Sequence, residues 1–270
     1  RRRGRLLLGR PVSPPRVAVL IPSRSPSLLD LCLLSHELFT PPPPEANVCV
    51  WVMDTRPGEP EPWTMVNEDA KRIHLLRPEG SGFYGRWCHS LALVAREEGA
   101  EFLVFQNDDT VVTPGWLDQM LLEFRGCAEG TRLGLLGACS NVASGLQLRV
   151  PVAGRDLGAL FASPAVVTFF AMTRTADYFE AGGFDLDLPA HNFSDFALSL
   201  RYLRAGFTNG VGSAFIPHFG SQTFRKDPGA HRADMAAGKA YMDRAYPGWV
   251  ETLFPGQEAK FLSCLGEQVK

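Results

Sequence analysis

The sequence predicts an α/β fold, in which a Rossmann-like, mostly parallel central sheet is flanked by helices within a single domain. Apolar runs alternate with amphipathic stretches along the chain, which is the pattern of helices packed on such a sheet. The segment Phe102 to Leu117, FLVFQNDDTVVTPGWL, shows this best, because an apolar run ends abruptly in polar residues and a helix start follows. A strand that is apolar at successive positions is buried on both faces, as central parallel strands are.

Length and composition fit this class. The chain has 270 residues, 45% of them hydrophobic and 21% charged, which is enough to bury a full core. A formal net charge of -2 gives no general reason to expect nucleic acid binding. The first five residues, RRRGR, begin a basic tail over residues 1–15 that we expect to be solvated, with contact to acidic lipid left open.

The compartment follows from two observations. Leu6, Leu7 and Leu8 are too few for a membrane span or a signal-peptide core. The cysteines lack the close CxxC spacing of zinc or redox sites, and we expect them to be reduced. We therefore expect a cytoplasmic protein, with peripheral association at the inner face of the membrane left open. The cysteines are Cys32, Cys49, Cys88, Cys127, Cys139 and Cys264.

The expected elements follow in order from apolar runs and turn signals. The first strand stops at Pro22, and Ser27 is a favoured residue to cap the helix that follows. The four prolines at 41–44 force an extended connector. We expect strands at Arg16–Ile21, Asn47–Met53, Ile73–Leu76, Phe102–Phe105, Leu133–Gly137, Val166–Met172 and Ile216–Phe219. We expect helices at Ser27–Leu38, Arg86–Glu98, after Pro114, Thr175–Ala181, Asp195–Ala205 and His231–Ala245.

Asn107, Asp108 and Asp109 stand at the carboxyl end of a predicted central strand, where open α/β sheets bind ligands. One carboxylate there would hold a hard divalent cation that neutralises a diphosphate, and its neighbour could accept a hydrogen bond from a sugar hydroxyl. Taken alone, the three residues are equally compatible with an ordinary polar turn.

Six sequence blocks occur together in a characteristic order. They are VAVLIPSRS, VWVMD, FQNDDTVVTPGWL, LLGACSNVASGLQ, GGFDLDLPAHNFSDFALSLRYLRAGF and IPHFGSQTF. Through these blocks the chain resembles family 2 glycosyltransferases of the GT-A fold, and in particular bacterial enzymes of polysaccharide biosynthesis. The resemblance implies a GT-A domain over residues 16–225, with a nucleotide-binding half at 16–115 and an acceptor half at 116–225. Residues 226–270 would form a C-terminal helical extension.

The resemblance implies a donor site at the ends of the first strands. Asp54 matches the acidic residue that contacts the nucleotide base or ribose, although Asp-Thr-Arg-Pro-Gly is also a turn sequence. Pro22, Ser23 and Arg24 would line the same pocket. Asp108 matches a ribose contact.

The metal site implied by the resemblance contains Asp109 and His218. Asn107 stands where many relatives carry the first acid of a DxD motif. Mn²⁺ or Mg²⁺ would complete its coordination with diphosphate and water oxygens, so one or two protein ligands suffice. A lone histidine is more often structural or exposed. Arg225 and Lys226 could close over the diphosphate or form a solvated charge pair.

Other polar residues are candidates for substrate contacts. Arg86 lies where relatives approach the donor, and its guanidinium could bind a diphosphate through two hydrogen bonds. The neighbouring Trp87 could simply pack in the core. Asn141 and Gln147 could bind acceptor hydroxyls, or they could cap loops.

Asp195 matches the catalytic base of the family. An inverting transfer needs a carboxylate that removes the acceptor hydroxyl proton. Ser194 stands where relatives often have Glu, and Ala197 replaces another commonly acidic residue. Asp195 could alternatively be only the N-cap of its helix.

The implied function is metal-dependent, inverting transfer of a sugar from a nucleoside diphosphate sugar to a carbohydrate or lipid-linked glycan acceptor. A binding protein that keeps the GT-A shell without turnover stays open, because of Asn107, Ser194 and Ala197. A sugar-phosphate nucleotidyltransferase is less favoured, since PSRSPS after the first strand contains no glycine. No GxGxxG follows that strand, which argues against a dinucleotide-dependent oxidoreductase.

Overall fold

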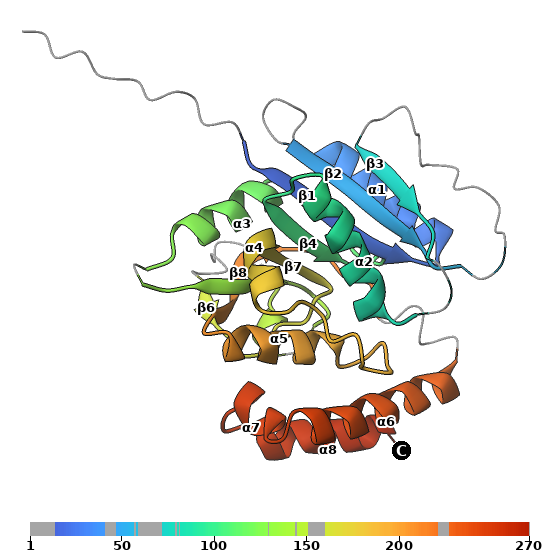
Figure 1. Ribbon diagram of the computed structural model, residues 1–270, viewed down its shortest axis with the longest axis vertical. Coiled ribbons are helices and arrows are strands. Elements are labelled where there is room, and N and C mark those ends of the chain that lie inside the picture. Colours follow the sequence, from blue (N-terminus) through green and yellow to red (C-terminus); the bar gives the residue numbers. More distant parts are fainter. Residues whose placement is uncertain are drawn as a thin grey trace, which may run out of the picture.

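The computed structural model describes residues 14–40, 47–56, 58, 72–78, 80, 82–128, 130–143, 145–150, 160–220 and 227–269. Within these residues eight strands form one sheet in the order β3-β2-β1-β4-β7-β5-β8-β6 (Figure 1). The strands are β1 Arg16–Ser23, β2 Asn47–Asp54, β3 Ile73–Leu76, β4 Phe102–Gln106, β5 Leu133–Cys139, β6 Phe161–Ala162, β7 Phe170–Arg174 and β8 Thr208–Phe215.

The sheet combines a parallel half with a mixed half. β3, β2, β1 and β4 run parallel to one another. β7 is antiparallel to β4 and to β5, β8 is parallel to β5, and β6 is antiparallel to β8. The predicted mostly parallel α/β sheet is confirmed. The carboxyl ends of β1, β2 and β4 consequently meet at one edge of the sheet.

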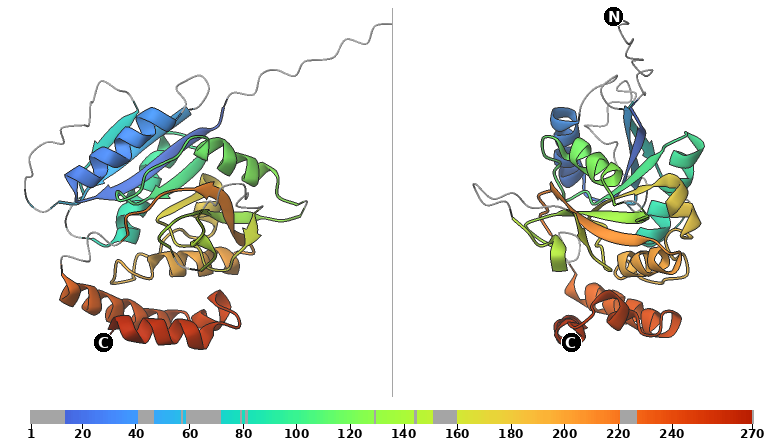
Figure 2. Two further views of the ribbon diagram at one scale, coloured as in Figure 1. Left: turned by 180° about the vertical axis from the view of Figure 1, so that it is seen from behind. Right: turned by 90° about the vertical axis from the view of Figure 1, so that its left-hand side faces the viewer.

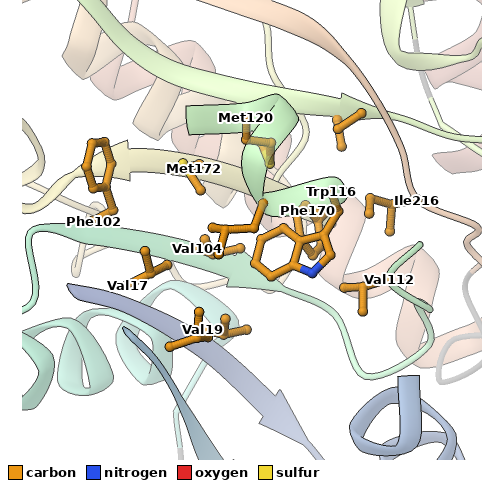
Figure 3. Close-up of a cluster of buried hydrophobic side chains, with 14 of the residues drawn as sticks. Val17, Val19, Phe102, Val104, Val112, Trp116, Met120, Phe170, Met172 and Ile216 are labelled. Atoms are coloured by element: carbon orange, nitrogen blue, oxygen red, sulfur yellow. The ribbon is translucent and has the colours of Figure 1, made fainter. Parts of the chain in front are cut away.

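Helices cover both faces of the sheet (Figure 2). α1 and α3 pack on one face, where the core centres on Val19, Val104 and Trp116 (Figure 3). α2, α4 and α5 pack on the other, around Leu91 and Tyr178. The helices are α1 Pro26–Phe39, α2 Tyr84–Glu97, α3 Trp116–Arg125, α4 Thr175–Glu180, α5 Ser194–Arg204, α6 Pro228–Ala245, α7 Trp249–Leu253 and α8 Glu258–Val269, with a 3-10 turn at Gly145–Gln147.

A third layer is formed by α6, α7 and α8, which lie on the outer side of α5 (Figure 1). Its apolar core joins Ala197 and Leu200 of α5 to Met242, Trp249 and Leu253. The sequence predicted a single terminal helix, and α7 and α8 were missed. None of the helices in the described part of the chain is both long enough and apolar enough to cross a membrane.

Two strand predictions were wrong. The strand expected at Ile216–Phe219 lies earlier, as β8, because Gly210 and Gly212 interrupt the apolar pattern on which the prediction relied. Gly212 is needed because a Cβ there would overlap the carboxylate of Glu123. The strand expected from Val166 begins only at Phe170, because the amides before it bond to side chains instead of a neighbouring strand. Val166 N donates to Ser199 Oγ, and Val167 N donates to Gln147 Oε1.

The N-cap residues of two helices differ from the residues that the sequence suggested. Ser25, not Ser27, is the N-cap residue of α1, and Pro26 occupies the first helical turn. Phe193, not Asp195, is the N-cap residue of α5, so the alternative reading of Asp195 as a cap was wrong.

The side chains of Cys32, Cys49, Cys88, Cys127 and Cys139 are free thiols.

Candidate functional site

The ends of β1, β2 and β4 bring three predicted donor residues together. Ser23 and Asp54 are register partners in the parallel pair β1 and β2. Ser23 Oγ donates to Asp108 Oδ2 across a distance of 2.6 Å. Thr55 links the ends of β1 and β2, because its N–H and its hydroxyl both donate to Ser23 O, at 2.8 and 2.9 Å. The ends of these strands therefore carry a connected layer of buried polar groups.

Asp54 is held by arginines that the sequence analysis did not identify. Arg56 Nε donates to Asp54 Oδ1 and Arg56 Nη2 to Oδ2, each at 2.9 Å, a two-bond pairing. Arg77 Nε lies 3.7 Å from Asp54 Oδ2. Burial alone would raise the pKa of Asp54, but the hydrogen bonds and charges of the arginines bring that pKa below its usual value. In the sequence, the pairing of Asp54 with Arg56 was indicated by their closeness in Asp-Thr-Arg.

Asp108 behaves differently from Asp54. It is 9% exposed, and burial raises the pKa of its carboxyl to about 6. The hydrogen bond from Ser23 opposes this rise, and the negative charge of Asp109 adds to it. Burial and the neighbouring negative charge both disfavour the ionised form of Asp108.

Asp109 and His218 form the central pair of the site. Asp109 Oδ1 and His218 Nε2 lie 3.0 Å apart, and their side chains are only 8% and 11% exposed. The two atoms pair with each other, and neither has a further hydrogen-bond partner among the described residues. Burial lowers the pKa of His218, but the carboxylate of Asp109 outweighs it and leaves that pKa raised.

The backbone holds this pair in place. Thr110 and His218 form an isolated antiparallel bridge between the segment after β4 and the segment after β8. Val111 N donates to Pro217 O at 3.0 Å, and Phe219 N donates to Asp109 O at 2.9 Å. These segments would otherwise be independent loops. The bridge therefore fixes the separation of the carboxylate and the imidazole.

The imidazole of His218 is oriented from three sides. Its Nδ1 lies 2.9 Å from Val142 O, which leaves Nε2 directed towards Asp109. The ring stacks on Phe169, with centroids 5.0 Å apart and planes at 9°. Asn141 bonds to the backbone of His218 in both directions, at 2.8 and 3.1 Å. A histidine ring whose second nitrogen is held by a carbonyl has the arrangement usual for metal-binding imidazoles.

Asp195 lies in the first turn of α5. Its Oδ1 accepts from Phe196 N at 3.0 Å, and the Thr168 N–H also bonds to the carboxylate. Burial raises the pKa of Asp195 to about 6 against these hydrogen bonds. Thr168 is adjacent to Phe169, whose ring stacks on His218, so one short segment touches both the candidate base and the candidate metal pair.

The remaining predicted residues are placed as follows. Pro22 is buried in β1, and Arg24 is exposed beside it. Arg86 donates from Nε to Leu186 O at 2.8 Å. Arg225 and Lys226 lie outside the described residues.

The geometry gives no support to direct acceptor contacts by Asn141 and Gln147. The Asn141 amide is engaged with the His218 backbone. Gln147 is 1% exposed, and its amide bonds to Ala138 O at 3.1 Å and to both backbone groups of Val167, at 3.0 and 2.6 Å. These contacts give Gln147 a structural role between β5 and the segment before β7.

The donor set suits a divalent cation that keeps non-protein ligands. Among the described residues no group of three or more His, Cys, Asp or Glu side chains converges on one point. Asp109 and His218 nevertheless supply one oxygen and one nitrogen, both buried and both lacking a further hydrogen-bond partner among these residues. Mn²⁺ accepts both kinds of ligand, and diphosphate oxygens and water would complete its shell. The residues present therefore fit such a cation.

Comparison with known proteins supports the fold. No family model and no curated protein matches the sequence. Among solved structures, GalNAc-T7 crystallised with UDP, GalNAc and Mn²⁺ matches with a TM-score of 0.59 and 14% identity, over 75% of this chain but only 43% of that chain. Residues 1–349 of S. aureus TarS match with a TM-score of 0.55 and 13% identity, over 94% of this chain and 80% of that one. Both are GT-A glycosyltransferases, and the chain described here has the GT-A fold.

Proposed function

We propose that this protein is a metal-dependent, inverting glycosyltransferase that moves a sugar from a nucleoside diphosphate sugar to a hydroxyl acceptor. The observation that carries the proposal is the Asp109 and His218 pair, buried at the strand edge beside Asp108, whose facing atoms contact each other and have no other hydrogen-bond partner among the described residues. A buried carboxylate and imidazole side by side, with no third partner, supply an oxygen and a nitrogen to one cation. The Mn²⁺ in the GalNAc-T7 crystal supports testing that ion first.

Asp109 and His218 would hold the cation, and Asp108 would hold the donor ribose. When bound, a divalent cation neutralises the negative charge that develops on a leaving diphosphate. Asp54 remains the proposed nucleoside contact, with Arg56 fixing its carboxylate. Pro22, Ser23 and Arg24 remain proposed to line the pocket of Asp54, and Arg86 remains a proposed diphosphate contact, as guanidinium groups suit phosphate oxygens.

Asp195 would act as the general base. With a pKa raised to about 6, it is ionised at neutral pH but still basic enough to accept a proton. The acceptor hydroxyl would give its proton to Asp195 while its oxygen forms a bond to the anomeric carbon. The bond from that carbon to the diphosphate oxygen breaks on the opposite side, which inverts the anomeric configuration. The diphosphate leaves with the bonding electron pair.

The acceptor class, a carbohydrate or a lipid-linked glycan, is carried from the sequence resemblance. The expected cytoplasmic location is carried from the cysteine spacing and the short run Leu6 to Leu8, and peripheral membrane association from the basic residues of RRRGR. The UDP and GalNAc bound to GalNAc-T7 make UDP-sugars the first donor class to test.

Calorimetric titration of UDP, GDP and their sugar conjugates, with and without Mn²⁺, tests the donor site. We expect binding of one diphosphate class only in the presence of the cation, and a loss of about tenfold or more in affinity in Asp109→Asn. Asp118→Asn is the matched control, because Asp118 is an exposed acid in the first turn of α3. Equal binding by wild type and Asp109→Asn would overturn the metal assignment.

Turnover separates a transferase from a binding protein of the same fold. Product anomers identified by NMR should show inversion relative to the donor. Asp195→Asn should bind the donor and not transfer its sugar. Wild-type protein that binds a nucleotide sugar but transfers it to neither water nor any glycan acceptor would instead indicate a binding function.

A further inference from the structure

The turn that leads into α5 is held from outside by α6. Asp234 of α6 accepts three hydrogen bonds from two consecutive residues of this turn. His191 N donates to Oδ1 at 2.8 Å, while Asn192 N and Asn192 Nδ2 donate to Oδ2 at 2.9 and 2.6 Å. Hydrogen bonds to a carboxylate are about twice as strong as neutral ones. The C-terminal layer thus makes a dense polar contact with the acceptor half of the domain.

The residue that follows this contact has an unusual backbone conformation. Phe193 has φ 70°, and within the described part of the chain no other residue except glycine has a positive φ. A bulky residue in this region carries a cost of about 1 to 3 kcal/mol and persists only where its surroundings impose it. Phe193 O accepts from Ala197 N at 2.9 Å, which is the first backbone bond of α5. The direction of the turn therefore decides where α5 begins.

α6 approaches the turn closely because Gly238 lies one helical turn after Asp234 on the same face. A Cβ at Gly238 would lie 2.6 Å from Phe193 Cδ2 and 3.2 Å from Asn192 O. α6 thus places the carboxylate of Asp234 and the backbone of Gly238 against the turn from His191 to Phe193.

The loop before the turn is also tied to α6. Asp185 Oδ2 accepts from Tyr241 OH at 3.0 Å and from Tyr246 OH at 2.6 Å. The loop from Asp185 to Asn192 is consequently fixed at both of its ends by the same outer helix and its C-terminal residue. Its position follows the position of α6.

We propose that Asp234 is a positioning residue for Asp195, and that it acts by holding the His191 to Phe193 turn in the conformation that starts α5 at Ser194. This inference rests on the proposed function, since it assigns a supporting contact to the proposed general base. Asp234 touches neither Asp109 nor His218 in its observed hydrogen bonds, so its effect falls on the transfer step and not on donor binding.

The test compares Asp234→Asn and Asp234→Glu with Asp243→Asn. An asparagine at 234 replaces one acceptor oxygen with an NH₂ group that faces N–H donors. We expect kcat to fall by about 100-fold, the effect of a base displaced by ~1 Å, while the donor Kd stays within about twofold. Asp234→Glu keeps the charge and should recover part of kcat. Asp243 is an acid on the same helix that bonds to Lys239 and Trp249, and Asp243→Asn should leave kcat within about twofold.

Hydrogen exchange gives a readout that needs no substrate. The Ala197 amide should exchange about tenfold faster in Asp234→Asn than in wild type or Asp243→Asn, because local opening of the turn breaks its bond to Phe193 O. Gly238→Ala, which pushes α6 away from the turn, should have the same effect. Unchanged exchange, unchanged kcat in folded Asp234→Asn, or an equal loss in Asp243→Asn would overturn the positioning role. Absence of transfer by wild type would overturn the proposed function alone, since the exchange experiment is independent of it.

Discussion

Asp54 at the end of β2 and Asp195 at the start of α5 are both affected by burial, but their pKa values are shifted in opposite directions. Asp54 is bound by Arg56 through two hydrogen bonds, and its pKa is lowered despite its burial. Asp195 has no cation among its described hydrogen-bond partners, and burial raises its pKa to about 6. The first carboxylate stabilises the fold in its charged form. The second is held ionised at neutral pH at a cost.

This difference is the one expected between an acid that supports the fold and the proposed general base. A paired carboxylate is a poor proton acceptor, because its charge is already compensated. An unpaired one with a raised pKa suits general base catalysis near neutral pH. An ionised carboxylate therefore increases stability at position 54, whereas at position 195 it suits the proposed catalysis and lowers stability.

The largest expected effect is on turnover in Asp195→Asn. Removal of a general base lowers kcat by about 10² to 10⁴-fold. Donor affinity should be unchanged, since Asp195 lies on α5 and not at the strand edge. Steady-state kinetics with calorimetric donor binding measures both. A variant with normal kcat would remove Asp195 from the mechanism and end the contrast with Asp54.

The second prediction concerns stability at Asp54. Asp54→Ala removes both hydrogen bonds between Arg56 and Asp54 and should lower the free energy of unfolding at pH 7 by about 2 to 3 kcal/mol. Because the pKa of Asp54 is lowered by folding, its contribution is present above about pH 4, the unfolded value, and is lost as pH falls through the folded value. Urea unfolding at pH 7 and at pH 3 measures this. Glu180→Ala, which breaks an exposed pair with Arg132, is the control and should lower stability far less than Asp54→Ala.

Asp195→Asn should change stability in the opposite sense. Its raised pKa means that the folded protein binds the proton more tightly than the unfolded chain, so stability is lost as pH rises from about 4 to about 6. Asparagine resembles the protonated acid. We expect the variant to be about 1 to 2 kcal/mol more stable than wild type at pH 7.5 and equal to it near pH 4. A loss of stability at both pH values would show that Asp195 is a structural acid like Asp54.

The smallest effect is the pH dependence of wild-type turnover. The base works only when ionised, so kcat should fall on the acid side of about pH 6, by about tenfold between pH 7 and pH 5. Asp54 contributes nothing to this limb, because its lowered pKa keeps it ionised throughout. A pH profile at saturating donor and acceptor measures it. A limb centred near pH 4 would indicate a carboxylate with an ordinary environment.

Much of the fold was predictable because local signals agreed with the final packing. The strand at Ile73–Leu76 and the buried strand before Asp108 were placed correctly from apolar runs alone. β8 was misplaced, since Gly212 in it is required by Glu123 of α3, a contact invisible in the local sequence. The same limit applies to the site. Asp108 and Asp109 carried a motif, whereas Asp234 acts through partners that only the three-dimensional structure identifies.

The bridge between Thr110 and His218 has a consequence for the order of folding. It joins segments that are far apart in the chain, and such contacts form only after the entropy of closing a long loop has been lost. The parallel strands β1, β2 and β4 can pair earlier, yet Asp109 has no imidazole beside it until β8 has docked. Refolding protein should therefore regain most of its secondary structure before it regains the ability to bind a nucleotide with its cation. Binding competence would then mark the last step of folding, not the first.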